Sequence, residues 1–187
     1  LFAGSETKTA SEIFSPQSEY RPTEYLQQWC RFWFDGAQRL AVAKQLQQLR
    51  LHIIARTWPK HAWTYDAEAL SRLLTQYTEV FAQAADSMSL LAAEGRFSAQ
   101  LYALANRATL NQPEFKRSQR GNSVDPANRF LDHGNYLAYG MGATACWVLG
   151  LPHGLAVLHG KTRRGGLVFE KVHAITSVLL LSVAVFP

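Results

Sequence analysis

The chain has 187 residues, of which 48% are hydrophobic and 18% are charged, a balance that excludes a disordered chain and favours one globular domain. Its formal charge of +5 favours contact with polyanions, but charge alone does not identify a nucleic-acid-binding protein. Cys30 and Cys146 are far apart and form no Cys-x-x-Cys pair, which excludes a disulfide framework and a zinc knuckle.

The two ends give no sign of export or of a membrane span. Residues 1–8 lack the basic and apolar regions of an export signal, so we expect a cytoplasmic protein. Residues 175–187 are almost entirely apolar, but they fall short of the roughly 20 residues needed to cross a bilayer. We therefore expect no membrane association and interpret this segment as a buried helix or strand end.

Residues 1–16 are predicted to form a short extended piece, and a helical pattern begins near Pro22. Apolar side chains then recur at steps of three and four residues, which predicts one long helix, bent near Gly36 and ended by Trp58-Pro59. The side chains expected on its buried face are Tyr25, Trp29, Phe32, Trp33, Leu40, Leu46, Leu49 and Ile53.

Two further helices are predicted, over residues 66–84 with Asp66 as N-cap and over residues 89–111. Their inward side chains are expected to be Leu70, Leu73, Leu74, Tyr77 and Phe81 in the first, and Leu90, Leu91, Phe97, Leu101, Leu104 and Ala105 in the second. A basic loop over residues 116–123 should follow.

Asp125-Pro126 predicts the start of a last helix, or pair of helices, that continues to Leu149, where Gly150 ends it. Strand signal is limited to the two ends of the chain and to residues 155–158. The pattern as a whole predicts a mainly α protein with a short N-terminal β remnant.

The segment after residue 154 carries the strongest chemical signal. An apolar run leads to His159, and a glycine-rich loop with Lys161, Arg163 and Arg164 leads to Glu170. Imidazole and carboxylate suit a divalent metal, and the cations suit a neighbouring phosphate. From spacing alone, a solvated basic turn is the better interpretation, because charge runs usually face water.

Two other sites have structural interpretations from local sequence. Glu94 is interpreted as an exposed helix residue paired with an arginine such as Arg96 or Arg107. His133, Asn135 and Tyr136 lie close together in sequence beside Gly134. They are interpreted as a hydrogen-bonded core network on a helix whose other face carries Leu131, Leu137 and Tyr139.

Long stretches of the chain resemble a known family. Residues 16–27 (PQSEYRPTEYLQ), residues 125–140 (DPANRFLDHGNYLAYG) and residues 154–170 are similar, in the same order, to the type I-F form of the CRISPR-associated endonuclease that integrates new spacers. The resemblance covers about residues 5–170. It implies the helical catalytic half of that endonuclease, and a role in CRISPR adaptation and antiviral defence.

The resemblance also implies a catalytic metal site. In that family a glutamate, a histidine and an aspartate of the helical domain hold Mg²⁺ or Mn²⁺, and these positions fall on Glu94, His159 and Glu170. The third is a departure, because the family has aspartate there, and a further family aspartate falls on His173. His159 could instead act as a proton shuttle.

The implied reaction is attack of a DNA 3′-hydroxyl, or of water, on a phosphodiester in double-stranded or branched DNA. The candidate phosphate-binding residues are Arg120, Lys161, Arg163 and Arg164, with Lys116 and Arg117 as secondary candidates. Implied partners are DNA, a second copy through the family's N-terminal β domain, and the small adaptation partner that type I-F systems fuse to a helicase-nuclease.

We predict a β-domain remnant and linker over residues 1–16, the catalytic helical domain over 17–170 and a divergent tail over 171–187. The tail is interpreted as a frameshift or a fused junction. Two alternatives to an active enzyme remain. One is an inactive, degenerate fragment that retains only DNA or protein binding, and the other is a helical interaction module without a nucleic acid function.

Overall fold

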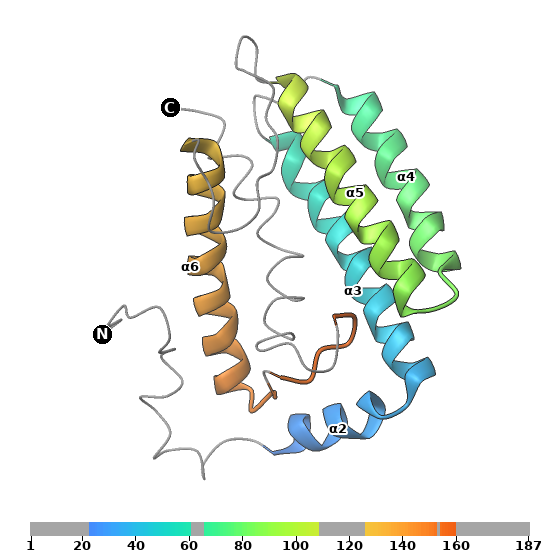
Figure 1. Cartoon of the computed structure of the whole chain (residues 1–187), viewed down its shortest axis with the longest axis vertical. Helices are drawn as coiled ribbons and strands as arrows, with labels where there is room; N and C mark the ends of the chain where they lie inside the picture. The colour runs from blue at the N-terminus through green and yellow to red at the C-terminus, as the bar shows by residue number, and fades with distance from the viewer. Residues whose placement is uncertain (1–22, 61–65, 109–125, 153, 160–187) are drawn as a thin grey trace.

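The described part of the chain is helical. The computed structural model describes residues 23–60, 66–108, 126–152 and 154–159 (Figure 1). No strand occurs in these ranges, which confirms the mainly α prediction, and the predicted β remnant over residues 1–16 lies outside them. The elements are α2 (Glu24–Trp33), α3 (Gly36–Thr57), the 3-10 turn η2 (Trp58–Lys60), α4 (Ala67–Gln83), α5 (Ser87–Ala108) and α6 (Pro126–Val148).

The long N-terminal helix is broken rather than bent. Asp35 has an extended backbone conformation, and its side chain accepts hydrogen bonds from the backbone N–H groups of Ala37 at 2.9 Å and Gln38 at 3.0 Å. An N-cap of this kind satisfies free amide groups at the start of a new helix. As a result, α2 ends at Trp33 and lies across one end of the molecule, at a steep angle to α3 (Figure 1).

The next two helices also begin at aspartate caps. Asp66 accepts a hydrogen bond from the Ala69 backbone N–H at 2.8 Å, as predicted. The prediction for α5 was two residues late, because Asp86 caps it and accepts from the Ser89 N–H at 2.7 Å. The Ser89 hydroxyl oxygen in turn accepts from the Asp86 N–H at 3.1 Å, which closes a reciprocal cap.

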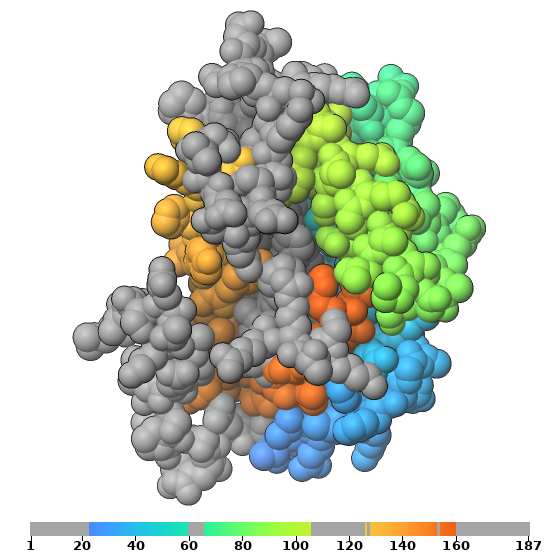
Figure 2. Space-filling view, viewed as in Figure 1, coloured from blue at the N-terminus to red at the C-terminus, as the bar shows by residue number. Residues whose placement is uncertain are grey.

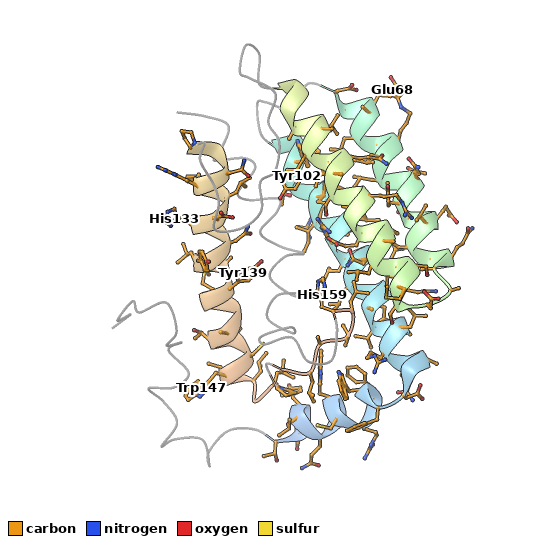
Figure 3. All side chains as sticks on the ribbon, in the orientation of Figure 1. Glu68, Tyr102, His133, Tyr139, Trp147 and His159 are labelled. Carbon is orange, nitrogen blue, oxygen red and sulfur yellow. The ribbon has the colours of Figure 1, made fainter. Side chains whose placement is uncertain are left out.

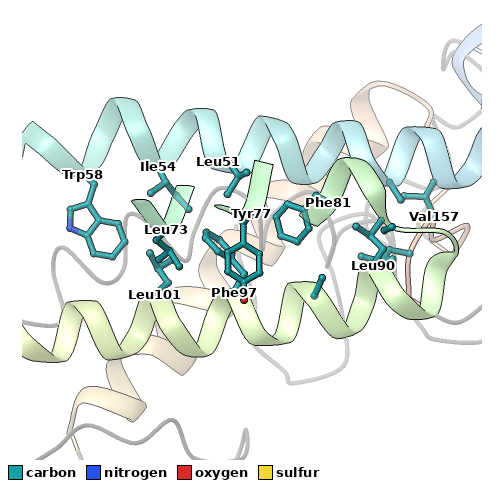
Figure 4. Close-up of a cluster of buried hydrophobic side chains, with 14 of the residues drawn as sticks. Leu51, Ile54, Trp58, Leu73, Tyr77, Phe81, Leu90, Phe97, Leu101 and Val157 are labelled. Atoms are coloured by element: carbon teal, nitrogen blue, oxygen red, sulfur yellow. The ribbon is translucent and has the colours of Figure 1, made fainter. Parts of the chain in front are cut away.

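Helices α3, α4 and α5 form an antiparallel layer around one hydrophobic core (Figures 1 and 4). At its centre the rings of Tyr77, Phe81 and Phe97 contact one another, with centroids 5.0–5.8 Å apart. The predicted inner faces of α4 and α5 are confirmed, with Leu74 and Leu91 only partly buried.

The predicted buried face of the first helical segment is partly wrong. The side chains of Tyr25 and Leu49 are about half exposed, at 50% and 49%. The break at Asp35 separates two helix axes, so a phase counted from Tyr25 does not continue into α3. The buried residues of α3 are Ala43, Arg50, Leu51 and Ile54.

Helix α6 begins at Pro126 and ends before Gly150, whose φ of 67° suits glycine, as predicted. Its expected cap, Asp125, lies outside the described residues. Within the described residues, no helix is both long enough and apolar enough to span a bilayer.

Residues 155–158 do not form the strand that their sequence suggested. They make an irregular segment whose core residues Ala156, Val157 and Leu158 are buried. In Figure 2 the orange-red atoms of segment 154–159 lie between α5 and α2. Two of its carbonyl groups are bound by side chains of α2 instead of a neighbouring strand.

Candidate active site

Glu94 is buried, contrary to the expectation from local sequence. Its residue exposure is 9%, and it lies on the inner face of α5 between Leu90 and Phe97, both of which are fully buried. Arg96, one of its expected partners, is exposed. A carboxylate at this position on an apolar helix face requires a charged or hydrogen-bonding partner.

Arg50 of α3 is that partner, 44 residues away in sequence. Its Nη1 donates to Glu94 Oε1 at 2.8 Å, and its Nη2 donates to the Ser98 hydroxyl at 3.0 Å. That hydroxyl donates in turn to the same Glu94 Oε1 at 3.0 Å. The guanidinium group also lies 5.0 Å from the centroid of the Phe97 ring, within cation–π range.

These contacts form a network in which Arg50 and Ser98 both donate to one oxygen of the Glu94 carboxylate. Both donors approach Oε1, which restrains the position of the carboxylate. Sequence analysis missed Arg50. A signal was available, because Arg50 follows Ala43 by seven residues and precedes Ile54 by four, so it falls on the apolar face of α3.

His159 comes at the end of the segment that packs under α5. Val157, two residues earlier, belongs to the same core cluster as Leu90, which precedes Glu94 by one helical turn. Figure 4 shows Val157 beside Leu90 at one end of the core, and Figure 3 shows His159 at that end of the layer. Glu94 and His159 therefore belong to neighbouring parts of the fold.

The remaining predicted site residues lie outside the described residues. These are Glu170 of the expected metal set and the expected phosphate ligands Arg120, Lys161, Arg163 and Arg164, together with Lys116 and Arg117. Among the residues that are described, no group of three His, Cys, Asp or Glu side chains is close enough to hold a metal ion. The described part of the predicted set is thus one carboxylate and one imidazole.

The polar cluster of α6 is partly as predicted. Asn135 is buried, with Asp132 and Asn128 on the same helix face, and these three form the polar part of its inner side. His133 and Tyr136 are exposed instead, because they lie on other faces of the helix. Leu131 and Leu137, which were placed together on the other face, differ, because Leu131 is buried and Leu137 is 70% exposed.

Comparison with known proteins gives a consistent result. The family described as CRISPR associated protein Cas1 matches residues 4–169. CRISPR-associated endonuclease Cas1 of Pseudomonas aeruginosa is 50% identical, and that of Pectobacterium atrosepticum is 49% identical, each over 97% of this chain. The chain spans 57% of the length of each of these relatives.

The fold is similar to that of a CAS1 protein from Thermotoga maritima. The TM-score is 0.72 at 16% sequence identity, and the match covers 89% of this chain and 54% of that one. Fold and sequence together define a CRISPR-associated protein. More particularly, the chain belongs to the Cas1 family, which confirms the resemblance found in its sequence. The type I-F assignment stays a prediction.

Proposed function

We propose that this chain carries the metal-binding, catalytic part of a DNA endonuclease or integrase of CRISPR adaptation. Its substrate would be double-stranded or branched DNA, and its reaction the attack of a 3′-hydroxyl or of water on a phosphodiester. The proposal includes a type I-F system in the cytoplasm, with a second copy and the small adaptation protein as partners. Membership of the Cas1 family supports the general role.

The observation that carries the proposal is the buried Glu94 carboxylate. A protein rarely buries a carboxylate unless it is paired. Here Arg50 pairs with Glu94, and Arg50 itself contacts Ser98 and the ring of Phe97. His159 follows Val157, which lies beside Leu90 at one end of the core, and Leu90 precedes Glu94 by one helical turn. Carboxylate oxygen and imidazole nitrogen are both donors that Mn²⁺ accepts, and the oxygen suits Mg²⁺. The donor set therefore fits the proposed metal.

In this proposal Glu94, His159 and Glu170 hold the metal. Arg50 and Ser98 fix Glu94 through Oε1, so that the carboxylate does not reorganise when the ion binds. A bound divalent ion would lower the pKa of the attacking hydroxyl group and stabilise negative charge on the phosphodiester. Arg120, Lys161, Arg163 and Arg164 would neutralise and orient the DNA backbone.

The test uses the full 187-residue chain with Mn²⁺ as probe, and measures free Mn²⁺ by electron paramagnetic resonance. Glu94→Gln and His159→Ala should each raise the Kd for Mn²⁺ at least tenfold and abolish cleavage of a branched DNA. Glu68→Gln and His133→Ala alter exposed side chains and should change neither. Mn²⁺ affinity that is independent of Glu94 and His159 would overturn the proposal.

Binding of the same branched DNA at several salt concentrations, measured beside the Mn²⁺ titration, separates the inactive alternative. A chain that binds branched DNA in a salt-dependent manner but binds no Mn²⁺ would be the degenerate fragment. A chain that binds neither would be an interaction module. The replacement of the family aspartate by Glu170 makes this distinction worth measuring.

A further inference from the structure

Two tryptophans of α2 hold the segment that leads to His159. The indole Nε1–H of Trp29 donates to the carbonyl oxygen of Leu155 at 3.0 Å, and that of Trp33 donates to Ala156 at 2.7 Å. The two donors are four residues apart, so they lie on the same face of α2, and they bind consecutive carbonyl groups. The contacts join parts of the chain that are 126 and 123 residues apart.

These hydrogen bonds take the place of the backbone hydrogen bonds that a neighbouring strand would supply. A buried carbonyl without a partner costs about 1–3 kcal/mol, and Ala156 is only 1% exposed. Trp33 is itself fixed, because the Arg39 guanidinium lies 5.6 Å from the centroid of its ring and donates to its carbonyl oxygen at 3.1 Å. An immobilised donor therefore sets the position of the backbone three residues before His159.

We propose that Trp33, with Trp29 in support, is a positioning residue of the metal site. It anchors the 155–158 segment between α2 and α5, and thereby fixes where the His159 imidazole lies relative to Glu94. This inference rests on the proposed role of His159. It assigns a function to the indole N–H group in addition to the packing of the ring, which any large apolar side chain could supply.

The test is Trp33→Phe in the full chain, because phenylalanine retains an aromatic ring and lacks the N–H donor. The matched control is Trp58→Phe, since Trp58 is also buried, at 1% exposure, and lies at the opposite end of the core from Val157 (Figure 4). The Kd for Mn²⁺ is measured by electron paramagnetic resonance, and stability by urea unfolding. Trp33→Phe should raise the Kd about tenfold, while Trp58→Phe should leave it within about twofold.

The outcomes separate this inference from the proposed function. If His159→Ala raises the Kd but Trp33→Phe does not, the positioning role is wrong and the proposed function stands. If His159→Ala leaves the Kd unchanged, the proposed function itself fails. An equal rise in Trp58→Phe would show a general effect of destabilisation and would overturn the inference. Should Trp33→Phe not fold, Trp29→Phe supplies the measurement. A smaller rise in the Kd for Mn²⁺ is then expected, and an unchanged Kd would contradict the positioning role.

Discussion

Replacement of Arg50 by methionine tests the charge network most directly. Methionine keeps most of the volume and removes the charge, so the buried Glu94 carboxylate loses its cationic partner while the hydrogen bond from Ser98 is retained. At the observed 2.8 Å, two unit charges attract by roughly 6 kcal/mol in an effective dielectric constant of about 20. Desolvation of both groups opposes this attraction, and breaking a buried pair typically costs about 3–5 kcal/mol. We expect a loss of this size in the free energy of unfolding.

The assay is urea unfolding followed by circular dichroism, with the slope of the transition used to check that the mechanism is unchanged. The double variant Arg50→Met/Glu94→Met should recover most of the loss, because it buries no unpaired charge. Arg72→Met is the control, since Arg72 pairs with Glu68 on the surface of α4, and it should change stability by less than about 1 kcal/mol. The reasoning is refuted if Arg50→Met costs no more than Arg72→Met, or if the double variant is less stable than Arg50→Met.

Two further predictions concern the core and a helix cap. Phe97→Ala removes the ring that contacts Tyr77, Phe81 and Arg50, and should lower the free energy of unfolding by about 3–5 kcal/mol in urea; a loss below about 1 kcal/mol would contradict the packing described. Hydrogen bonds from the backbone and side chain of Ser89 hold the pKa of Asp86 below its ordinary value of 3.8. The stabilising contribution of Asp86 is therefore present above that value, and it is lost as the pH falls through the lower pKa of the folded state. Asp86→Asn caps without titrating, and its stability should therefore fall less steeply than that of the parent chain below about pH 4; identical acid profiles would contradict this assignment.

The fold could largely be predicted because its signals are local. Asp66 and Gly150 mark helix ends through their own backbone chemistry, and the apolar spacing of α4 and α5 specifies which faces are buried. Asp35 was missed as a boundary because apolar residues continue on both sides of it. The resulting error in phase placed Leu49 inside the core and left Arg50 unnoticed.

The candidate site was less accessible from sequence, because its contacts join distant parts of the chain. Local spacing paired Glu94 with a neighbouring arginine, whereas its partner is 44 residues away in α3. Only the family resemblance identified Glu94 as a candidate metal ligand, and the resemblance did not explain why this carboxylate is buried. Trp29 and Trp33 were correctly predicted to lie on a buried helix face, but their hydrogen bonds have no sequence signature.

The distance along the chain between α2 and the segment it holds bears on the order of folding. The hairpins of α3, α4 and α5 close over short loops, so they can assemble as soon as these helices have left the ribosome. The Trp29 and Trp33 contacts join residues 126 and 123 positions apart, so they require the closure of a far longer loop. The helical layer with its carboxylate therefore has the shorter loops to close, and the segment that carries His159 can dock on it only after residues 155–156 have been synthesised.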